Sequence, residues 1–280
     1  MRNRSRKIAL VLALCTTLLT SGCATTHSGG GAPLRAGLRY EAEIGEQIHA
    51  KIMSSFAPYT EPRLGSYVQK VGYSLTAFAN RKLPYRFIIL QSDKVYATSA
   101  PGGYVYLTTA MLYFLENESQ LAAVLAHEIG ELQFQDYKVN TTQKNLETAT
   151  YITAHLAPLF GPIGMLAAAG LATACAVGNY KNLPPAQKLA AADKHALHSM
   201  VRAGYDPQGL LDLVYKFSQK TPETLPYFTD YLTSRPFAES RIAALEKNFD
   251  KLPLEGRRFE AHRNTFLEAT KGIRQIYSLA

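Results

Sequence analysis

The feature that most constrains the fold is a helix predicted over residues 117–136, whose apolar side chains recur at helical spacing. Asn117, followed three residues later by Gln120, is a typical helix start. The run that begins at His127 reads HEIGE. Because residues four apart lie one above the other on a helix, His127 and Glu131 share one face.

This face has the spacing of a zinc-hydrolase motif but not its full set of ligands. A zinc peptidase of the gluzincin type needs two histidines at i and i+4, with a third, carboxylate ligand from a later helix. The glutamate after the first histidine then takes the proton from the metal-bound water. Here His127 can be the first ligand and Glu128 the base, but the second histidine position is Glu131. Taken alone, a His-Glu pair on a helix is weak evidence of function.

A small sheet is predicted before this helix. Segments 85–90, 95–98 and 104–108 are rich in aromatic and β-branched residues, and Pro101-Gly102-Gly103 separates the last two. Most of the rest of the chain reads as amphipathic helix. Helices are expected at 40–56 and 64–79, from Pro184-Pro185 to about Ala203, after Asp206-Pro207, and twice between Pro236 and the end. These patterns predict a mostly helical α+β fold.

Residues 156–179 carry no charge and contain several prolines and glycines. Only about 16 residues of uninterrupted helix remain from Gly164 onward, which is short of the roughly 20 that span a bilayer. A buried or membrane-facing hairpin is therefore favoured over a membrane-spanning helix.

Several stretches together resemble a known family. They are 97–109 (ATSAPGGYVYLTT), 118–130 (ESQLAAVLAHEIG), Ala192-Asp193, 203–207 (AGYDP), 233–236 (TSRP) and 241–242 (RI). Over roughly residues 40–249 the chain is similar to the HtpX and CAAX-prenyl-protease type of zinc peptidases, peptidase family M-48, and most of all to its periplasmic lipoprotein members. The resemblance implies a zincin-like metallopeptidase domain with a small sheet beside the active-site helix, and zinc as the family's cofactor.

The resemblance also implies a peptide-binding strand. In that family the Pro-Gly-Gly-Tyr strand lies beside the active-site helix as an edge that can pair with substrate backbone. Gly102, Gly103, Tyr104 and Val105 match it. Pairing at a strand edge gives sequence-tolerant affinity for extended peptides and needs no metal.

The family's third zinc ligand is missing. It is a glutamate four residues before the aspartate of the Ala-Asp pair, and since Asp193 matches that aspartate, the ligand position falls on Leu189. No glutamate occurs between Glu147 and Glu223, so no other alignment restores it. The resemblance implies that Asp193 orients the first histidine, with a role as substitute ligand left open.

Further positions near the expected cleft also differ. The family's Ser-His-Pro element appears here with Arg235 in place of the histidine, and Arg241 matches a later arginine of the family. Arg235 is expected either to pair with Glu131 or Glu128 or to be exposed to solvent. His195 and His198 point away from Asp193 on their helix, so they are expected to face solvent rather than to rebuild a metal site.

The N-terminus has the pattern of an exported lipoprotein. Arg2, Arg4, Arg6 and Lys7 precede an apolar run, and Leu19-Thr20-Ser21-Gly22-Cys23 resembles a bacterial lipobox. Residues 1–22 are thus predicted to be a signal peptide, Cys23 the lipidated residue, 23–39 a flexible tether and 40–280 the peptidase-like domain. An ordinary signal peptide cleaved elsewhere is the alternative. Ala24 favours the periplasmic side of the outer membrane of a Gram-negative type of cell.

Charge and cysteines exclude other classes. The first 22 residues hold four of the 30 basic residues and none of the 22 acidic ones, so the remainder carries 26 basic and 22 acidic side chains, a net charge of +4. This balance gives no support for a nucleic-acid partner. Of the three cysteines, Cys15 leaves with the signal and Cys23 is lipidated, so Cys175 has no partner for an intrachain disulfide.

Three functions remain open on the sequence. The leading hypothesis is a degenerate peptidase, anchored by lipid, that binds peptides or unfolded envelope proteins without standard zinc catalysis. The second is an active metalloendopeptidase that uses His127, Glu131 and Asp193 or water as ligands, with Glu128 as base. The third is a structural envelope lipoprotein.

Overall fold

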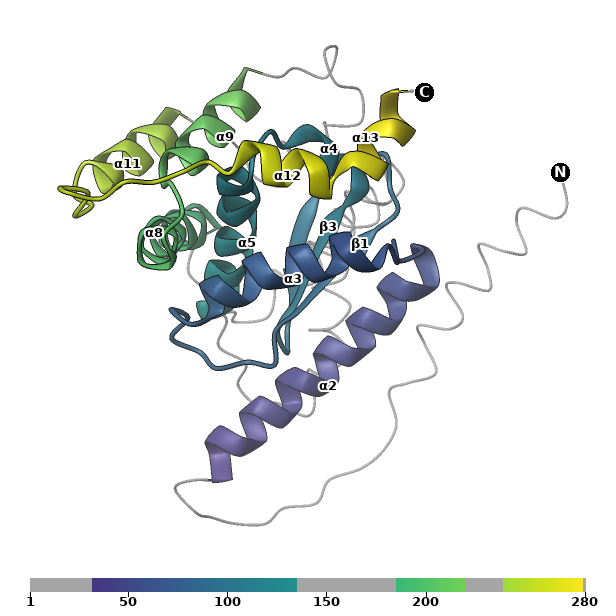
Figure 1. The fold of residues 1–280 in the computed structure, drawn as a ribbon. Coiled ribbons are helices and arrows are strands. Elements are labelled where there is room, and N and C mark those ends of the chain that lie inside the picture. Colours follow the sequence, from purple (N-terminus) through teal and green to yellow (C-terminus); the bar gives the residue numbers. More distant parts are fainter. Residues whose placement is uncertain (1–31, 135–184, 220–238, 279–280) are drawn as a thin grey trace, which may run out of the picture. The chain divides into compact units, whose positions relative to one another are not determined.

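The computed structural model describes residues 32–134, 185–219 and 239–278. Helices and strands lie both before and after the candidate helix α5 in the chain (Figure 1). Before it lie α2 (Ala32–Ser55), α3 (Pro62–Thr76), β1 (Arg86–Leu90), β2 (Ala97–Ala100), β3 (Tyr104–Thr108) and α4 (Thr109–Phe114). Then come α5 (Glu118–Gln133), α8 (Pro185–Ala203), α9 (Gln208–Ser218), α11 (Glu239–Phe249), α12 (Arg263–Ala269) and α13 (Lys271–Ser278). The mostly helical α+β fold with a small sheet is confirmed.

Several predicted features lie outside the described residues. They are the signal peptide, the lipidated Cys23, most of the tether, the apolar segment 156–179 and Arg235. Within the described residues, no helix is both long and apolar enough to traverse a membrane.

Two element boundaries differ from the prediction. Helix α2 begins at Ala32, so residues 32–39, at the end of the predicted tether, are helical. Pro33 does not prevent this, because an N–H in the first turn has no helical acceptor and its loss costs little. Beyond residue 238 the structure has three helices where two were expected, since the chain breaks between α12 and α13 at Thr270.

The sheet has the order β1-β3-β2, with β1 parallel and β2 antiparallel to β3. The expectation that the Gly102–Val105 strand is an edge is therefore wrong. Tyr104 pairs with Arg86 of β1 on one side and with Ala100 of β2 on the other, so β3 is the central strand. All five β3 residues are buried, as expected for a strand with neighbours on both edges. The edge on the α5 side is β2.

Gly102 and Gly103 form the turn between β2 and β3. Their φ angles are 78° and 90°, in the region that glycine adopts without strain. A Cβ on Gly103 would also lie 3.0 Å from the carbonyl oxygen of Pro84. These two glycines are thus required by the geometry of the turn.

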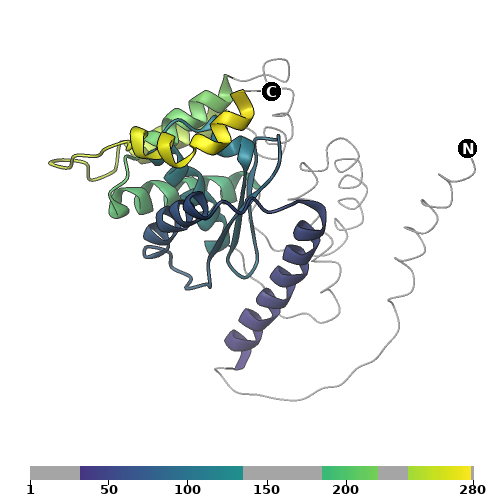
Figure 2. The ribbon, with the colours of Figure 1, turned by 45° about the vertical axis from the view of Figure 1, so that its right-hand side comes forward.

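The two faces of the sheet are covered by different helices. Figure 2 shows α2 on one side and the C-terminal helices gathered on the other. On the α2 side, His49 Nδ1 lies 2.9 Å from the Tyr106 hydroxyl and its ring stacks on Tyr104 at 4.6 Å. On the opposite side α3 packs on β1 and α5 packs on β2. The core consists of apolar residues of these helices and strands, and those of the helices recur at the helical spacing that the sequence predicted.

A buried ion pair connects α2 to the sheet turn and to α5. Glu41 is 1% exposed and pairs with Arg81. The Glu41 carboxylate also accepts a hydrogen bond from the Gly102 N–H at 3.2 Å, and Arg81 Nη1 donates to the carbonyl of Leu132 at 2.7 Å. Because a buried carboxylate is stable only when paired and hydrogen-bonded, this cluster fixes where α2 meets the turn.

Candidate active site

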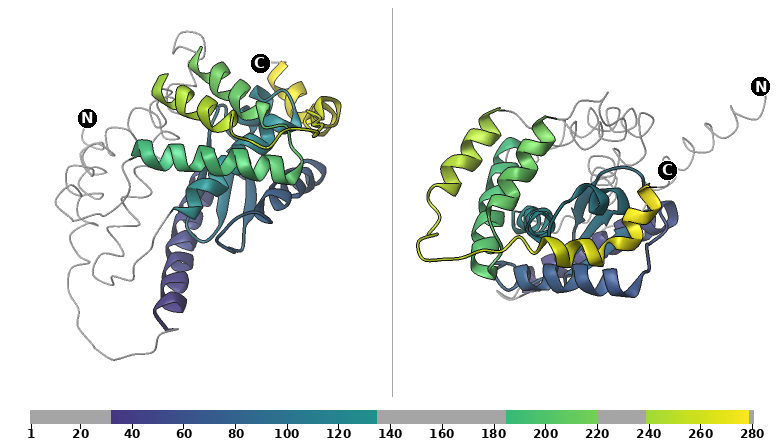
Figure 3. Two further views of the ribbon diagram at one scale, coloured as in Figure 1. Left: turned by 90° about the vertical axis from the view of Figure 1, so that its left-hand side faces the viewer. Right: turned by 45° about the horizontal axis from the view of Figure 1, so that its top comes forward.

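Helix α5 carries the candidate residues, and it is the most enclosed helix of the described chain. The Asn117 side chain caps it by accepting from the N–H of Gln120 at 2.9 Å, as predicted. Figure 3 shows α5 between the sheet on one side and α8 and α9 on the other. His127 is 4% exposed and Glu128 is fully buried. Both polar side chains are therefore held in a largely dry environment.

The two ring nitrogens of His127 face different carboxylates. Nδ1 lies 2.8 Å from Oδ1 of Asp193, on α8. Nε2 lies 3.5 Å from Oε1 of Glu131, one turn further along α5. The sequence expectation that Asp193 lies against the first histidine thus agrees with the geometry. Since Nδ1 and Nε2 point to opposite sides of the ring, Asp193 cannot share an ion with Nε2.

Asp193 is held in turn by Arg241 of α11. The Arg241 Nε donates to Oδ2 at 2.8 Å and its Nη2 donates to Oδ1 at 3.0 Å, so the pair is bidentate. Burial by itself would raise the pKa of Asp193, but the Arg241 guanidinium and His127 outweigh it and hold the pKa well below its usual range. The carboxylate is therefore ionised. Three helices, α5, α8 and α11, meet at this one side chain.

A close helix contact brings Asp193 to His127. A Cβ on Gly130 of α5 would lie 2.8 Å from the carbonyl oxygen of Ala192 and 3.0 Å from its Cα. Only glycine permits this approach of α5 to α8. Sequence reasoning missed the role of Gly130; a glycine inside an otherwise strong helix pattern was the available signal.

The residues present do not match the standard zinc donor set. Leu189, the position of the family's third ligand, is 9% exposed and supplies no ligand atom. Within the described ranges, no group of three His, Cys, Asp or Glu side chains is arranged to hold a metal ion. His127 Nε2 and the Glu131 carboxylate are close enough to contact a common ion, but zinc in such sites has three protein ligands.

His195 differs from its prediction, whereas His198 agrees. His198 is exposed, but His195 is only partly exposed, and its Nε2 is buried without a hydrogen-bond partner in the described chain. Burial, followed by the charges of His198 and His127, lowers the pKa of His195 to about 4. His195 faces away from Asp193 on the helix, but its side chain is partly buried by neighbouring residues and does not face solvent.

The mostly helical fold with its small three-stranded sheet is consistent with an M48 peptidase domain. The sequence pattern of peptidase family M48 matches residues 62–248 of the chain. The chain therefore belongs to this family of zinc metallopeptidases.

Two relatives have the same name. The chain is 28% identical over 222 residues to the beta-barrel assembly-enhancing protease of Escherichia coli (strain K12), which covers 72% of this chain and 42% of the relative. It is 28% identical over 232 residues to the protein of that name from Yersinia pestis, which covers 77% of this chain and 45% of the relative. The chain thus matches less than half the length of these relatives.

Proposed function

We propose that this chain is a degenerate M48 peptidase that binds peptides or unfolded envelope proteins without standard zinc hydrolysis. The observation that carries the proposal is the pair of replaced ligand positions, Glu131 and Leu189, beside an otherwise ordered His127. The proposal includes a lipid anchor at Cys23 and a location on the periplasmic side of the outer membrane. Zinc, the family's cofactor, is not required for this function.

The geometry around His127 supports loss of the ion. The Glu131 carboxylate lies 3.5 Å from Nε2, the nitrogen that would bind the metal. A carboxylate at the position of the second imidazole makes the ligand set rich in oxygen, which suits harder ions better than zinc. Asp193 already contacts Nδ1 and Arg241, so it does not complete a ligand set on the other side of the ring.

One observation favours the alternative of an active metalloendopeptidase. Glu128, the position of the general base, is retained and fully buried next to His127. Carboxylates do bind zinc, so His127 and Glu131 with water would be an unusual but chemically allowed set. Metal content distinguishes the two functions.

The first experiment measures zinc in the purified chain by mass spectrometry. We expect the wild type to hold far less than one zinc per chain, and the double variant Glu131→His with Leu189→Glu to approach one, because it restores the family's ligands. Leu189→Glu alone is the matched control, since it adds the buried carboxylate without the second histidine. Stoichiometric zinc in the wild type that is lost in Glu131→Ala would sink the proposal.

The second experiment measures proteolysis of an unfolded protein such as casein. We expect no chelator-sensitive cleavage by the wild type, and cleavage by the double variant that disappears when Glu128→Gln is added. Chelator-sensitive cleavage by the wild type that Glu128→Gln abolishes would support the active enzyme instead.

The partner class is proposed from the name of these relatives and from the fold. An unfolded outer-membrane β-barrel protein is the natural probe, because it is rich in extended segments that can pair with a strand edge. Among the described residues, strand β2 is the sheet edge beside α5 and its four residues are buried, so a probe that pairs with this edge should change hydrogen exchange in residues 97–100. Binding of the probe with unchanged exchange there would place its binding elsewhere.

A further inference from the structure

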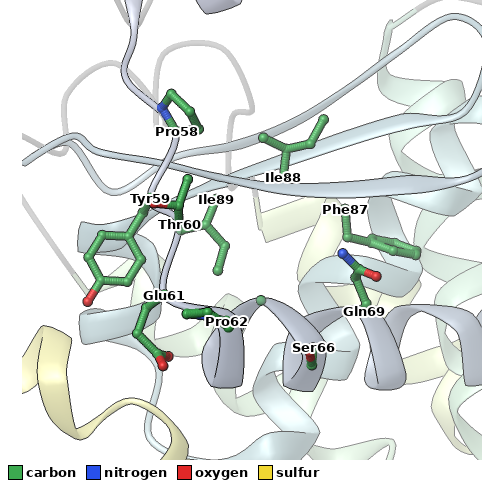
Figure 4. A pocket seen from close by; sticks show the side chains of 11 residues that line it. Pro58, Tyr59, Thr60, Glu61, Pro62, Ser66, Gln69, Phe87, Ile88 and Ile89 are labelled. Atoms are coloured by element: carbon green, nitrogen blue, oxygen red, sulfur yellow. The ribbon is translucent and has the colours of Figure 1, made fainter.

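A groove lies along β1, at the edge of the sheet opposite β2 (Figure 4). Its volume is about 340 Å³, within the range of ligand-binding clefts. Strand β1 forms one wall with Phe87, Ile88 and Ile89, and the first turns of α3 form the other with Gly65 and Gln69. The groove belongs to neither the β2 edge nor the surroundings of His127.

Within the described residues, the backbone of β1 presents to this groove hydrogen-bonding groups that have no backbone partner. The Arg86 N–H donates to Gly103 at 2.8 Å, so Arg86, Ile88 and Leu90 direct their N–H and C=O groups toward β3. Since these directions alternate along a strand, Phe87 and Ile89 direct theirs outward. In the described chain only the Ile89 carbonyl has an outward backbone partner, the N–H of Tyr59 at 2.8 Å. The N–H groups of Phe87 and Ile89 and the carbonyl of Phe87 remain for a ligand.

The chain itself begins to occupy this edge and then leaves it. Pro58 bridges antiparallel to Leu90, and the N–H of Gln91 donates to the Ala57 carbonyl at 2.9 Å. The chain then turns into α3 at Glu61, whose carboxylate caps the helix by accepting from Arg63 and Leu64. These contacts set the direction and the spacing of a strand added to β1. The strand that the chain begins at Pro58 does not continue opposite Phe87.

Helix α3 limits what can fill the remaining edge. It stands beside β1 along the groove, so the slot between them suits one isolated extended segment better than the edge of a second sheet. Gly65 opens the slot, because a Cβ there would meet no atom within 4 Å. A residue of small or moderate size therefore fits opposite Gly65.

We propose that this groove binds an extended peptide segment of a partner protein, about three residues long, which adds to β1 as an antiparallel strand. Recognition is by main-chain hydrogen bonds to Phe87 and Ile89, with the side chain opposite Gly65 restricted in size. The site does not depend on the degenerate metal site, so either function can fail without the other.

The test is selection from a randomised library of displayed peptides of about seven residues on the purified full chain. We expect peptides to be enriched on the wild type and to bind Gly65→Leu at least about tenfold more weakly, because the new side chain fills the slot. Lys70→Leu, on an exposed part of the same helix outside the groove, is the matched control and should bind as the wild type does.

Two further measurements identify the binding mode. Methylation of the peptide nitrogens that face β1 should abolish binding, whereas methylation of the alternate nitrogens should not, and the bound peptide should slow hydrogen exchange at Phe87 and Ile89. The proposal is overturned if no peptide is enriched, if Gly65→Leu binds like Lys70→Leu, or if both methylated forms bind equally. A change in oligomeric state of Gly65→Leu by light scattering would instead assign the groove to a second copy.

Discussion

At the scale of single residues, the orientation of His127 depends on a carboxylate and a guanidinium. Asp193 contacts Nδ1 at 2.8 Å and is bound bidentately by Arg241. This arrangement holds the ring from its Nδ1 side. Because these side chains are buried, each charged group is stable only while its oppositely charged partner is present.

Asp193→Asn tests that dependence. The change leaves the buried Arg241 charge without a carboxylate, and we expect the free energy of unfolding to fall by about 3–5 kcal/mol. Urea unfolding followed by circular dichroism measures it. Asp212→Asn, on an exposed part of α9, is the control and should change stability by less than about 0.5 kcal/mol. Equal stability of the two variants would contradict the buried ion pair.

His195 provides a pH-dependent prediction. Its pKa is about 4 in the folded chain and about 6.5 when unfolded, so the unfolded chain binds more protons between these values. Stability is therefore complete above about pH 6.5 and decreases as the pH falls toward 4.

We expect the wild type to lose about 2 kcal/mol more than His195→Gln between pH 7 and pH 5. Urea unfolding at the two pH values measures this difference, in which contributions of the other histidines cancel. Identical losses in the two proteins would show that His195 is not buried as the structure describes.

At the scale of elements, the contact between α5 and α8 decides whether Asp193 reaches His127. Gly130 allows it, because the Ala192 carbonyl lies only 2.8 Å from the position of a Cβ. Gly65, on α3, has open space instead. The same substitution at these two helical glycines should therefore have opposite effects.

Gly130→Ala is expected to lower the free energy of unfolding by about 1–3 kcal/mol through overpacking. Gly65→Ala is expected to raise it by about 0.5–1 kcal/mol, because alanine favours helix and meets no neighbour. Thermal and urea unfolding of both variants check the pair. Stabilisation by Gly130→Ala would mean that the helices are further apart than described.

The elements also show which features could be predicted from the sequence. Apolar periodicity and the Asn117 cap predicted α5, and segments rich in aromatic and β-branched residues predicted three strands, because these signals are local. The order of the strands is not local: β3 was expected at an edge, yet β1, which precedes β2 in the chain, pairs with its far side. The contact of Arg241 with Asp193 likewise joins residues 48 apart, and only packing determines it.

At the scale of the whole molecule, the M48 match and the longer relatives define what remains to be tested. The described helices and sheet cover part of the matched region 62–248, whereas the N-terminal lipid anchor stays a prediction. Cys23→Ala should move the chain from the membrane fraction to the soluble periplasmic fraction and abolish labelling by palmitate. Cell fractionation with an antibody measures this, with Cys175→Ala as control. Lipidation of Cys23 would be contradicted if Cys23→Ala stayed in the membrane fraction and the wild type took up no palmitate.

Helices α5, α8 and α11 meet at Asp193, and this contact affects how the fold can evolve. Because the joint is made by a carboxylate and a guanidinium, residues on the far side of the imidazole can be exchanged one at a time while the framework stays folded. A lineage of enzymes can therefore pass through intermediates that have lost catalysis and kept their shape. Descendants of that kind are available for selection on binding alone.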